Sequence, residues 1–202
     1  MDDFKEMAGS YEIMQRCRFG GKELLIGHDS QNAGQEYMTC YRRIGFFGEE
    51  ELCDAVGSKD FLEVMKIYQE RLGERIEAVE AQRSQRQLPF QAMGQEHCQS
   101  GGENDYFEGK VVVISPESLA PEYRSADHQL GIAISGFGCS PNTRGRAVYV
   151  EDLYTGKESR WDRSDILGVA SLDKLPVWAQ KKLAEREKQR PEKKKMQGGQ
   201  AR

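Results

Sequence analysis

Few residues of the kinds that build catalytic and metal sites occur in this sequence. It has only three histidines, and its five cysteines include no Cys-x-x-Cys pair. It also lacks the GxGxxG and GxxxxGK[ST] loops that hold nucleotide phosphates. His97 and Cys98 are adjacent, so they cannot easily chelate one tetrahedral zinc ion without ligands from elsewhere. We therefore expect no enzyme, metal or cofactor, although Asp127 beside His128 leaves an acid–base pair as a minority alternative.

The sequence also lacks a recognisable secretion signal and any run long enough to span a membrane. Residues 1–9 are acidic and lack the apolar region of a signal peptide. The longest apolar run, Val111–Ile114, is far shorter than the roughly 20 residues that cross a bilayer. An odd number of scattered cysteines is typical of reduced thiols. These absences predict a soluble, cytoplasmic protein that does not enter a membrane.

The composition indicates modest hydrophobic cores and an uneven distribution of charge. Of the 202 residues, 38% are hydrophobic and 31% are charged, which suits one ordinary domain or two small ones joined by polar segments. The net charge is −4. Residues 174–202 carry ten Lys/Arg against three Glu, a net charge of +7, which leaves −11 for residues 1–173. The sequence therefore combines an acidic body with a basic C-terminal tail.

Residues 10–86 are predicted to form a small antiparallel sheet covered by one long helix. Strands are expected at 11–17, 22–26, 36–44 and, less clearly, 48–56, with a turn at the Gly20-Gly21 pair. In the first strand, alternation predicts one face made of Tyr11, Ile13, Gln15 and Cys17. A helix at about 59–85, N-capped by Ser58, follows from apolar residues at helical spacing: Phe61, Met65, Tyr68, Leu72, Ile76 and Val79.

The remaining chain is predicted to hold a second β-rich domain. Residues 87–105 are polar and aperiodic, typical of a flexible linker. A domain at 106–185 is expected to be a small bent sheet or partial barrel with a terminal helix, and 186–202 a disordered basic tail. The whole is thus predicted to be an α+β protein. Its five C-terminal strands are expected at 109–114, 128–135, 146–153, 158–161 and 165–169.

The segment Gly136–Arg146 stands out between two of these strands. Its glycines, proline and Asn142 predict a loop. The loop carries Arg144 and Arg146 but no acidic residue, so it has the chemistry to bind phosphate or a partner's carboxylates. A hairpin connection with solvated arginines is the other interpretation of the same pattern.

Basic and aromatic residues alternate through the strands that follow this loop. On a small bent sheet they would form a stacking platform with an electrostatic groove, the usual surface for nucleic acid. The interleaved acids Glu151, Asp152, Glu158, Asp162 and Asp165 leave the alternative that these charges pair with one another. The predicted nucleic-acid or partner-binding residues are Arg144, Arg146, Asn142, Lys157, Arg160, Trp161 and Tyr149.

A second short motif lies in the predicted linker. Gln85, Leu88 and Phe90 have the spacing of the glutamine–leucine–phenylalanine peptides that dock on bacterial sliding clamps. Such peptides must lie in an exposed linker, as this motif is predicted to do. The pattern is short, and an ordinary linker is the simpler interpretation.

Several longer segments of the sequence form recognisable patterns. In the first half these are Tyr11-Glu-Ile-Met-Gln, Gly-Gly-Lys-Glu-Leu-Leu-Ile-Gly27 and Ser58-Lys-Asp-Phe-Leu-Glu-Val. In the second half they include Gly109-Lys-Val-Val-Val-Ile-Ser-Pro, Gly136-Phe-Gly-Cys-Ser-Pro and Leu175-Pro-Val-Trp178. These segments resemble uncharacterised accessory domains of integrative conjugative elements, plasmids and phages of gut Firmicutes. The resemblance carries over no catalytic or binding residue.

What the resemblance implies is a role in the conflict between mobile elements and their hosts. We expect a mobile-element-encoded inhibitor of host defence, of anti-CRISPR or antirestriction type. It would bind a Cas9-type or restriction nuclease complex and block its engagement with DNA. The alternative is a nucleic-acid-binding accessory module for transfer or replication of the element.

Overall fold

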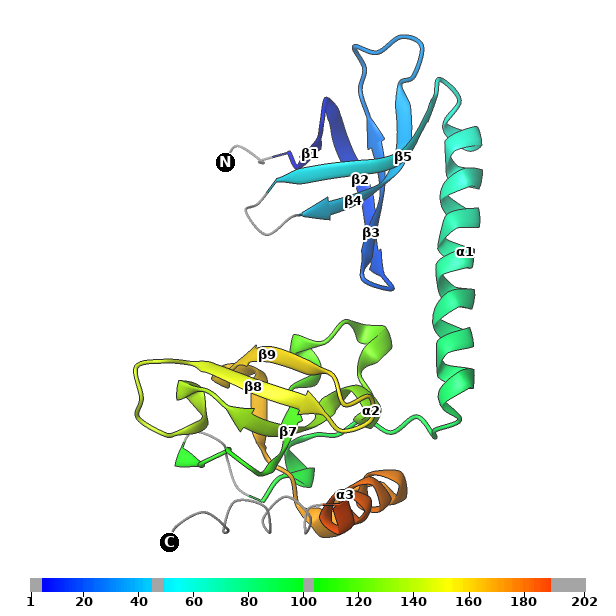
Figure 1. Ribbon diagram of the computed structural model, residues 1–202. Helices are drawn as coiled ribbons and strands as arrows, with labels where there is room; N and C mark the ends of the chain where they lie inside the picture. The colour runs from blue at the N-terminus through cyan, green and yellow to red at the C-terminus, as the bar shows by residue number, and fades with distance from the viewer. Residues whose placement is uncertain (1–4, 45–48, 100–103, 190–202) are drawn as a thin grey trace, which may run out of the picture. The chain divides into compact units, whose positions relative to one another are not determined.

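The computed structural model describes residues 5–44, 49–99 and 104–189. The chain divides into two compact units, with the boundary between Leu88 and Pro89. Each unit combines an antiparallel sheet with α-helix, one long helix in the first unit and shorter helices in the second (Figure 1), so the predicted α+β class is confirmed. None of the helices in the described ranges has the length and apolar character that crossing a bilayer requires.

The first unit is a five-stranded antiparallel meander. All four predicted strands are present, including the ambiguous fourth, and two additional residues pair as a short edge strand. Gly20 and Gly21 both have positive φ, 59° and 75°, which suits the tight turn expected there. The strands are β1 (Met7–Ala8), β2 (Tyr11–Phe19), β3 (Lys22–His28), β4 (Tyr37–Ile44) and β5 (Glu50–Ser58), paired in that order.

A β-bulge in β2 overturns the predicted alternation of that strand. The register with β3 shifts between Ile13 and Gln15, which leaves Met14 as an extra residue. An inserted residue moves all later side chains to the opposite face. Tyr11 and Ile13 therefore pack on one face of the sheet, whereas Cys17 packs on the other, among the residues that contact the helix.

Both faces of this curled sheet are apolar. One face holds a core that includes Tyr11, Leu25, Met38 and Cys40. The other is covered by α1 (Phe61–Arg86) and includes Leu24, Ile26, Tyr41, Val64 and Tyr68. In Figure 1 the long helix runs beside the strands of its own unit.

The start and the buried face of α1 differ in detail from prediction. Asp60 rather than Ser58 is the N-cap, because its carboxylate accepts a hydrogen bond from the Leu62 amide at 2.9 Å. Tyr68 is buried as expected, but Ile76 is 40% exposed and Val64 is fully buried. Ile76 is not part of the apolar cluster between the sheet and the helix, whose helical members are Val64, Met65, Tyr68 and Leu72, whereas the predicted Val79 is buried as expected.

The second unit is also a five-stranded antiparallel sheet, and its predicted strands are confirmed. Its strand order is β10-β6-β7-β8-β9, so the last strand pairs with the first. His128 lies in the short helix α2 (Ala126–Gln129) rather than at a strand start. The strands are β6 (Val111–Ile114), β7 (Leu130–Ser135), β8 (Ala147–Asp152), β9 (Glu158–Asp162) and β10 (Ile166–Val169), and α3 spans Val177–Gln189.

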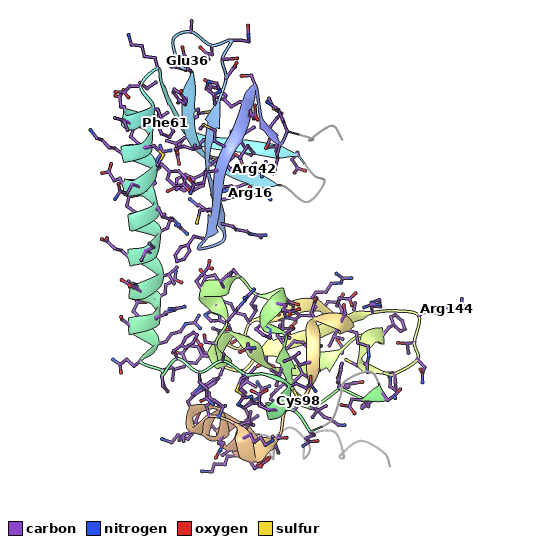
Figure 2. The ribbon with its side chains drawn as sticks, turned by 180° about the vertical axis from the view of Figure 1, so that it is seen from behind. Arg16, Glu36, Arg42, Phe61, Cys98 and Arg144 are labelled. Atoms are coloured by element: carbon purple, nitrogen blue, oxygen red, sulfur yellow. The ribbon has the colours of Figure 1, made fainter. Side chains whose placement is uncertain are left out.

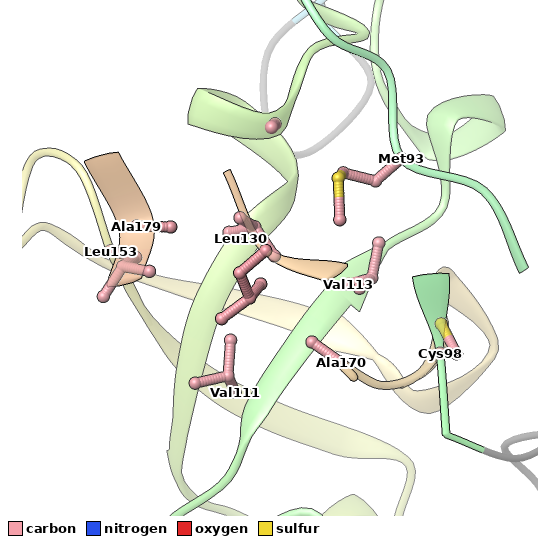
Figure 3. Packing of buried hydrophobic residues seen from close by; sticks show 10 residues of the cluster. Met93, Cys98, Val111, Val113, Leu130, Leu153, Ala170 and Ala179 are labelled. Carbon is pink, nitrogen blue, oxygen red and sulfur yellow. The ribbon is translucent and has the colours of Figure 1, made fainter. Parts of the chain in front are cut away.

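Much of the predicted linker belongs to the core of this second unit. Met93 is only 1% exposed and packs with Val113 and Leu130 (Figure 3). The buried amide of Gln129 accepts a hydrogen bond from the Met93 amide at 2.8 Å and donates to the Met93 carbonyl at 2.9 Å. The flexible linker predicted for 87–105 is therefore wrong for residues 91–99, which the buried Gln129 amide, the Cys98–Ala170 bridge and further backbone hydrogen bonds hold in place.

The predicted disordered tail begins too early. Helix α3 continues through Arg186, whose guanidinium group makes two hydrogen bonds to the Glu151 carboxylate, at 2.5 and 2.8 Å. This bidentate pair fixes the last turns of the helix on β8 despite their lack of apolar residues. The rest of the predicted tail, residues 190–202, lies outside the described residues.

Candidate binding surface

The loop Gly136–Arg146 joins β7 to β8 and folds back on itself. It opens with a 3-10 turn, Phe137–Cys139, and Asn142 takes the left-handed conformation with φ of 60°. The Thr143 hydroxyl lies 2.5 Å from the Phe137 carbonyl oxygen and 3.1 Å from that of Gly145. These contacts tie the two arms of the loop together, so the loop has a defined shape.

The glycines of this loop are required by close packing of its arms. A Cβ atom on Gly136 would stand 2.3 Å from the Ala147 carbonyl oxygen, and one on Gly138 would stand 2.3 Å from that of Arg146. Both distances are far below a van der Waals contact. Packing thus accounts for these two glycines without a bound anion.

Arg146 and Arg163 are engaged by groups of the second unit. Arg146 Nε lies 2.8 Å from Asp162 Oδ1, and the Asp162 carboxylate also accepts hydrogen bonds from the amide and hydroxyl of Ser164. These contacts lower the pKa of Asp162 to about 2, those from Ser164 most strongly. Arg163 donates to the Gly138 carbonyl and lies over the ring of Phe107, 4.2 Å from its centroid. For Arg146, the alternative that the charges pair with one another is therefore the correct one.

The predicted aromatic platform is divided between the two faces of the sheet. In the β8–β9 ladder, Tyr149 is opposite Arg160, and Val148 is opposite Trp161. Tyr149 is 44% exposed, whereas Trp161 packs against the cluster that contains Val148 and Val150. Because adjacent residues of a strand point to opposite faces, Tyr149 and Trp161 cannot stack on the same ligand.

Two other predicted binding residues, Lys157 and Asn142, lie outside the strands of the sheet. Lys157 is exposed in the turn between β8 and β9, at the end of the hairpin away from the Gly136–Arg146 loop. A six-residue strand separates the two ends by about 17 Å at 3.3 Å per residue. Asn142 is exposed within the loop itself.

Phe137 is the residue that sequence reasoning missed. Its side chain is 79% exposed, the highest value among the large exposed hydrophobic residues of the described part. Its Cβ approaches Gly145, next to Arg144, and Arg144 is exposed near the outer end of the loop (Figure 2). A partial signal was present, because Gly136 and Gly138 on either side disfavour regular structure around this aromatic residue.

Four exposed residues come from the loop and from the two strands next to it, and we call them together the Phe137 surface. Ser135, two residues before Phe137, is opposite Tyr149 in the β7–β8 ladder, and Tyr149 is opposite Arg160. Neither Arg144 nor Arg160 forms an ion pair with any carboxylate of the described ranges. The Phe137 surface consists of Phe137, Arg144, Tyr149 and Arg160.

The clamp-type motif does not have the extended form that docking requires. Gln85 is part of α1, which ends at Arg86. Leu88 is half-buried, and Phe90 is 64% exposed. Gln85 lies in the helix, whereas Leu88 and Phe90 follow it, so the three side chains do not lie along one extended peptide.

Reactive groups are sparse throughout residues 5–44, 49–99 and 104–189. No cluster of three His, Cys, Asp or Glu side chains there could hold a metal ion. Burial raises the pKa of the Cys40 thiol to about 11 and also raises the pKa values of Cys98 and Cys139, which keeps these thiols protonated and poorly nucleophilic. His128 lies 3.6 Å from Asp127 and stacks on Tyr123 at 4.9 Å.

Comparison with known proteins identifies no relative of this chain. No family model, curated protein or solved structure matches this chain. Function must therefore be argued from the surface itself.

Proposed function

We propose that this chain is a non-catalytic binding protein that inhibits a host defence nuclease by docking on it through the Phe137 surface. The observation that carries the proposal is the exposure of Phe137, 79%, on a loop whose shape is fixed by Thr143. Burying a phenylalanine side chain contributes about 1.5–3 kcal/mol. A pre-shaped loop loses little entropy on binding, so most of that gain reaches the affinity.

The chemistry of the surface favours a protein partner over bare nucleic acid. Aromatic and arginine residues dominate the energetic centres of protein interfaces. Next to Arg160, however, Glu158 is exposed on the same strand, and the Asp162 carboxylate neutralises Arg146. A phosphate backbone would meet these acids at a cost, whereas a protein surface can match a mixed set of charges.

The acidic character of the rest of the chain supports a partner that carries a basic groove. Residues 1–173 hold a net charge of −11, and several glutamates of α1 are exposed on its outer side. Such a body is repelled by DNA and attracted to the cationic groove in which a nuclease holds nucleic acid. The resemblance to accessory domains of mobile elements supports the same choice of partner. The exposed glutamates are Glu63, Glu70, Glu74, Glu77 and Glu80.

The test is a DNA cleavage assay with a Cas9-type complex and, in parallel, a restriction enzyme, titrated with the full chain. We expect inhibition together with loss of the nuclease–DNA complex in a mobility shift. Phe137→Ala should raise the half-inhibitory concentration at least tenfold, since 1.4 kcal/mol corresponds to about a factor of ten. Leu172→Ala is the matched control, because Leu172 is an exposed hydrophobic residue (56%) of the same unit outside the Phe137 surface. Absence of inhibition of both nucleases, or inhibition that Phe137→Ala leaves intact, would refute the proposal.

Direct binding of single-stranded nucleic acid is the second candidate. It is favoured by the exposed Arg144 and Arg160, which form no ion pair with any described carboxylate, and by the exposed aromatic residues of the Phe137 surface. It predicts a salt-sensitive mobility shift with the protein alone, weakened by Arg144→Ala together with Arg160→Ala. Arg146→Ala and Trp161→Ala are unsuitable, because they would disturb the Asp162 pair and the packing beneath the sheet. A shift without nuclease would select this function over the first.

A further inference from the structure

The outer edge of strand β9 is open to pairing with another strand. Among the described residues, β8 is the only strand that pairs with β9, which ends the sheet (Figure 1). The opposite edge is covered, because the Gln99 amide donates a hydrogen bond to the Val169 carbonyl of β10 at 2.8 Å. Proline, lysine and bulges usually protect an exposed edge. Glu158–Asp162 contains neither residue and pairs with β8 without a register shift, so this edge is unprotected.

The backbone groups of Glu158 and Arg160 face the open edge. Hydrogen-bonded pairs alternate with non-bonded pairs along an antiparallel ladder. Backbone hydrogen bonds of 2.9 and 2.8 Å at the two ends of the β8–β9 ladder fix this alternation, and they join Asp152 to Lys157 and Arg163 to Arg146. Ser159 and Trp161 therefore bond to β8, whereas Glu158 and Arg160 direct their N–H and C=O groups outward. The Asp162 amide donates to the Asp165 carboxylate at 2.9 Å, so the open edge ends there.

The side chains of Glu158 and Arg160 give this edge one charge of each sign. They lie on the same face of β9, two residues apart, and both are exposed. Neither forms an ion pair with a charged side chain of the described ranges. In its own sheet Glu158 is opposite Glu151, whose carboxylate is held by Arg186. Glu158 thus has an acidic neighbour on its inner side and room for a cation on its outer side.

We propose that β9 pairs in the antiparallel direction with β9 of a second copy of the chain, about a two-fold axis at Ser159. A two-fold interface requires a surface that complements itself. With this axis, Glu158 of each copy is opposite Arg160 of the other, so both ion pairs form at once. The residues of a hydrogen-bonded pair lie about 5.5 Å apart at Cα and exchange two backbone hydrogen bonds. The two pairs thus join the sheets through four backbone hydrogen bonds and two ion pairs.

The charges of β9 select this register over its neighbours. Outward backbone groups are available within β9 at Glu158 and Arg160, so a symmetric pairing must be centred on residue 158, 159 or 160. An axis at Glu158 places the two copies of that glutamate opposite each other. An axis at Arg160 does the same for two arginines and places Glu158 opposite Asp162. Like charges directly opposite one another are destabilising, so the axis at Ser159 is preferred.

The experiment is sedimentation velocity of the full chain at a series of protein concentrations. We expect a monomer–dimer equilibrium. Glu158→Arg alone and Arg160→Glu alone should each raise the dimer dissociation constant at least tenfold, because each places like charges opposite one another twice. An equal mixture of the two variants should restore the dimer, since every pair then joins an arginine with a glutamate. Glu117→Arg, the same change at an exposed residue of the same unit outside β9, is the matched control.

Hydrogen exchange locates the contact. Rising protein concentration should slow exchange at the amides of Glu158 and Arg160, whereas those of Ser159 and Trp161, bonded to β8, stay protected throughout. A chain that remains monomeric at every concentration would overturn the proposal, and so would a dimer that Glu158→Arg and Glu117→Arg leave equally strong. Restored association in the mixture excludes misfolding as the cause of weak pairing by the single variants. Phe137→Ala should leave the dimer intact, so this test is independent of nuclease inhibition.

Discussion

Replacing Arg42 with methionine should destabilise the first unit strongly at neutral pH. The buried guanidinium group joins three carboxylates that come from separate segments: Glu6 before β1, Glu23 on β3 and Glu50 on β5. Removing one partner of a buried ion pair costs about 3–5 kcal/mol, because the opposite charges lose their compensation. Glu6 and Glu50 are 46% and 35% exposed and can turn to water, whereas Glu23 is only 17% exposed. We therefore expect a loss near the lower end, about 3 kcal/mol.

The loss should depend on pH in a defined direction. Hydrogen bonding to Arg42 lowers the pKa of Glu6 below its ordinary value. The stabilisation from this pair is therefore present above the ordinary carboxyl pKa and is lost as the pH falls through the lowered value. In Arg42→Met the carboxylates repel one another, and acid relieves that repulsion. The difference in unfolding free energy between the two proteins should therefore shrink between pH 7 and pH 4.

Hydrogen exchange of the Leu25 and Cys40 amides, both in the buried core of the first sheet, measures this difference. Both tryptophans, Trp161 and Trp178, lie in the second unit, so their fluorescence reports separately on that unit. Arg16→Met is the control: Arg16 is 54% exposed, and an exposed pair contributes at most about 1 kcal/mol. A loss below 1 kcal/mol for Arg42→Met, or an equal loss at both pH values, would refute the reasoning.

Three further substitutions test the packing. The buried Tyr68 hydroxyl has no hydrogen-bond partner among the described residues, so Tyr68→Phe should leave the free energy of unfolding unchanged or raise it by up to about 1 kcal/mol in urea denaturation; a clear loss would reveal a partner. Gly138→Ala should cost about 1–3 kcal/mol by tryptophan fluorescence, because the new methyl group meets the backbone; an unchanged midpoint would contradict the loop geometry. Arg186→Gln should cost about 1 kcal/mol at pH 7, since its pair with Glu151 is partly exposed. Arg186 lowers the Glu151 pKa, so this cost should vanish as the pH falls through that lowered value; a cost that persists at pH 3 would exclude the pair.

Local patterns in the sequence determined the elements of both units. Gly20-Gly21 requires a turn because only glycine adopts two successive positive φ values cheaply. The apolar spacing around Tyr68 requires a helix, and the valine run at 111–113 a buried strand. The exposure of Arg144 also followed from its position in the loop. These features depend on residues close together in the chain, which is why composition and periodicity sufficed.

Tertiary structure decided which groups are available for binding. The bulge at Met14 changes the face of every later residue in β2, and the β8–β9 register separates Trp161 from Tyr149. Residues 91–99 look polar and free in the sequence, yet the single buried amide of Gln129 holds Met93 in the core. Arg146 and Arg144 are equivalent in sequence, but within the described ranges Arg146 forms an ion pair with a carboxylate and Arg144 forms none. Such choices depend on distances between segments far apart in the chain, and local residue pattern does not encode them.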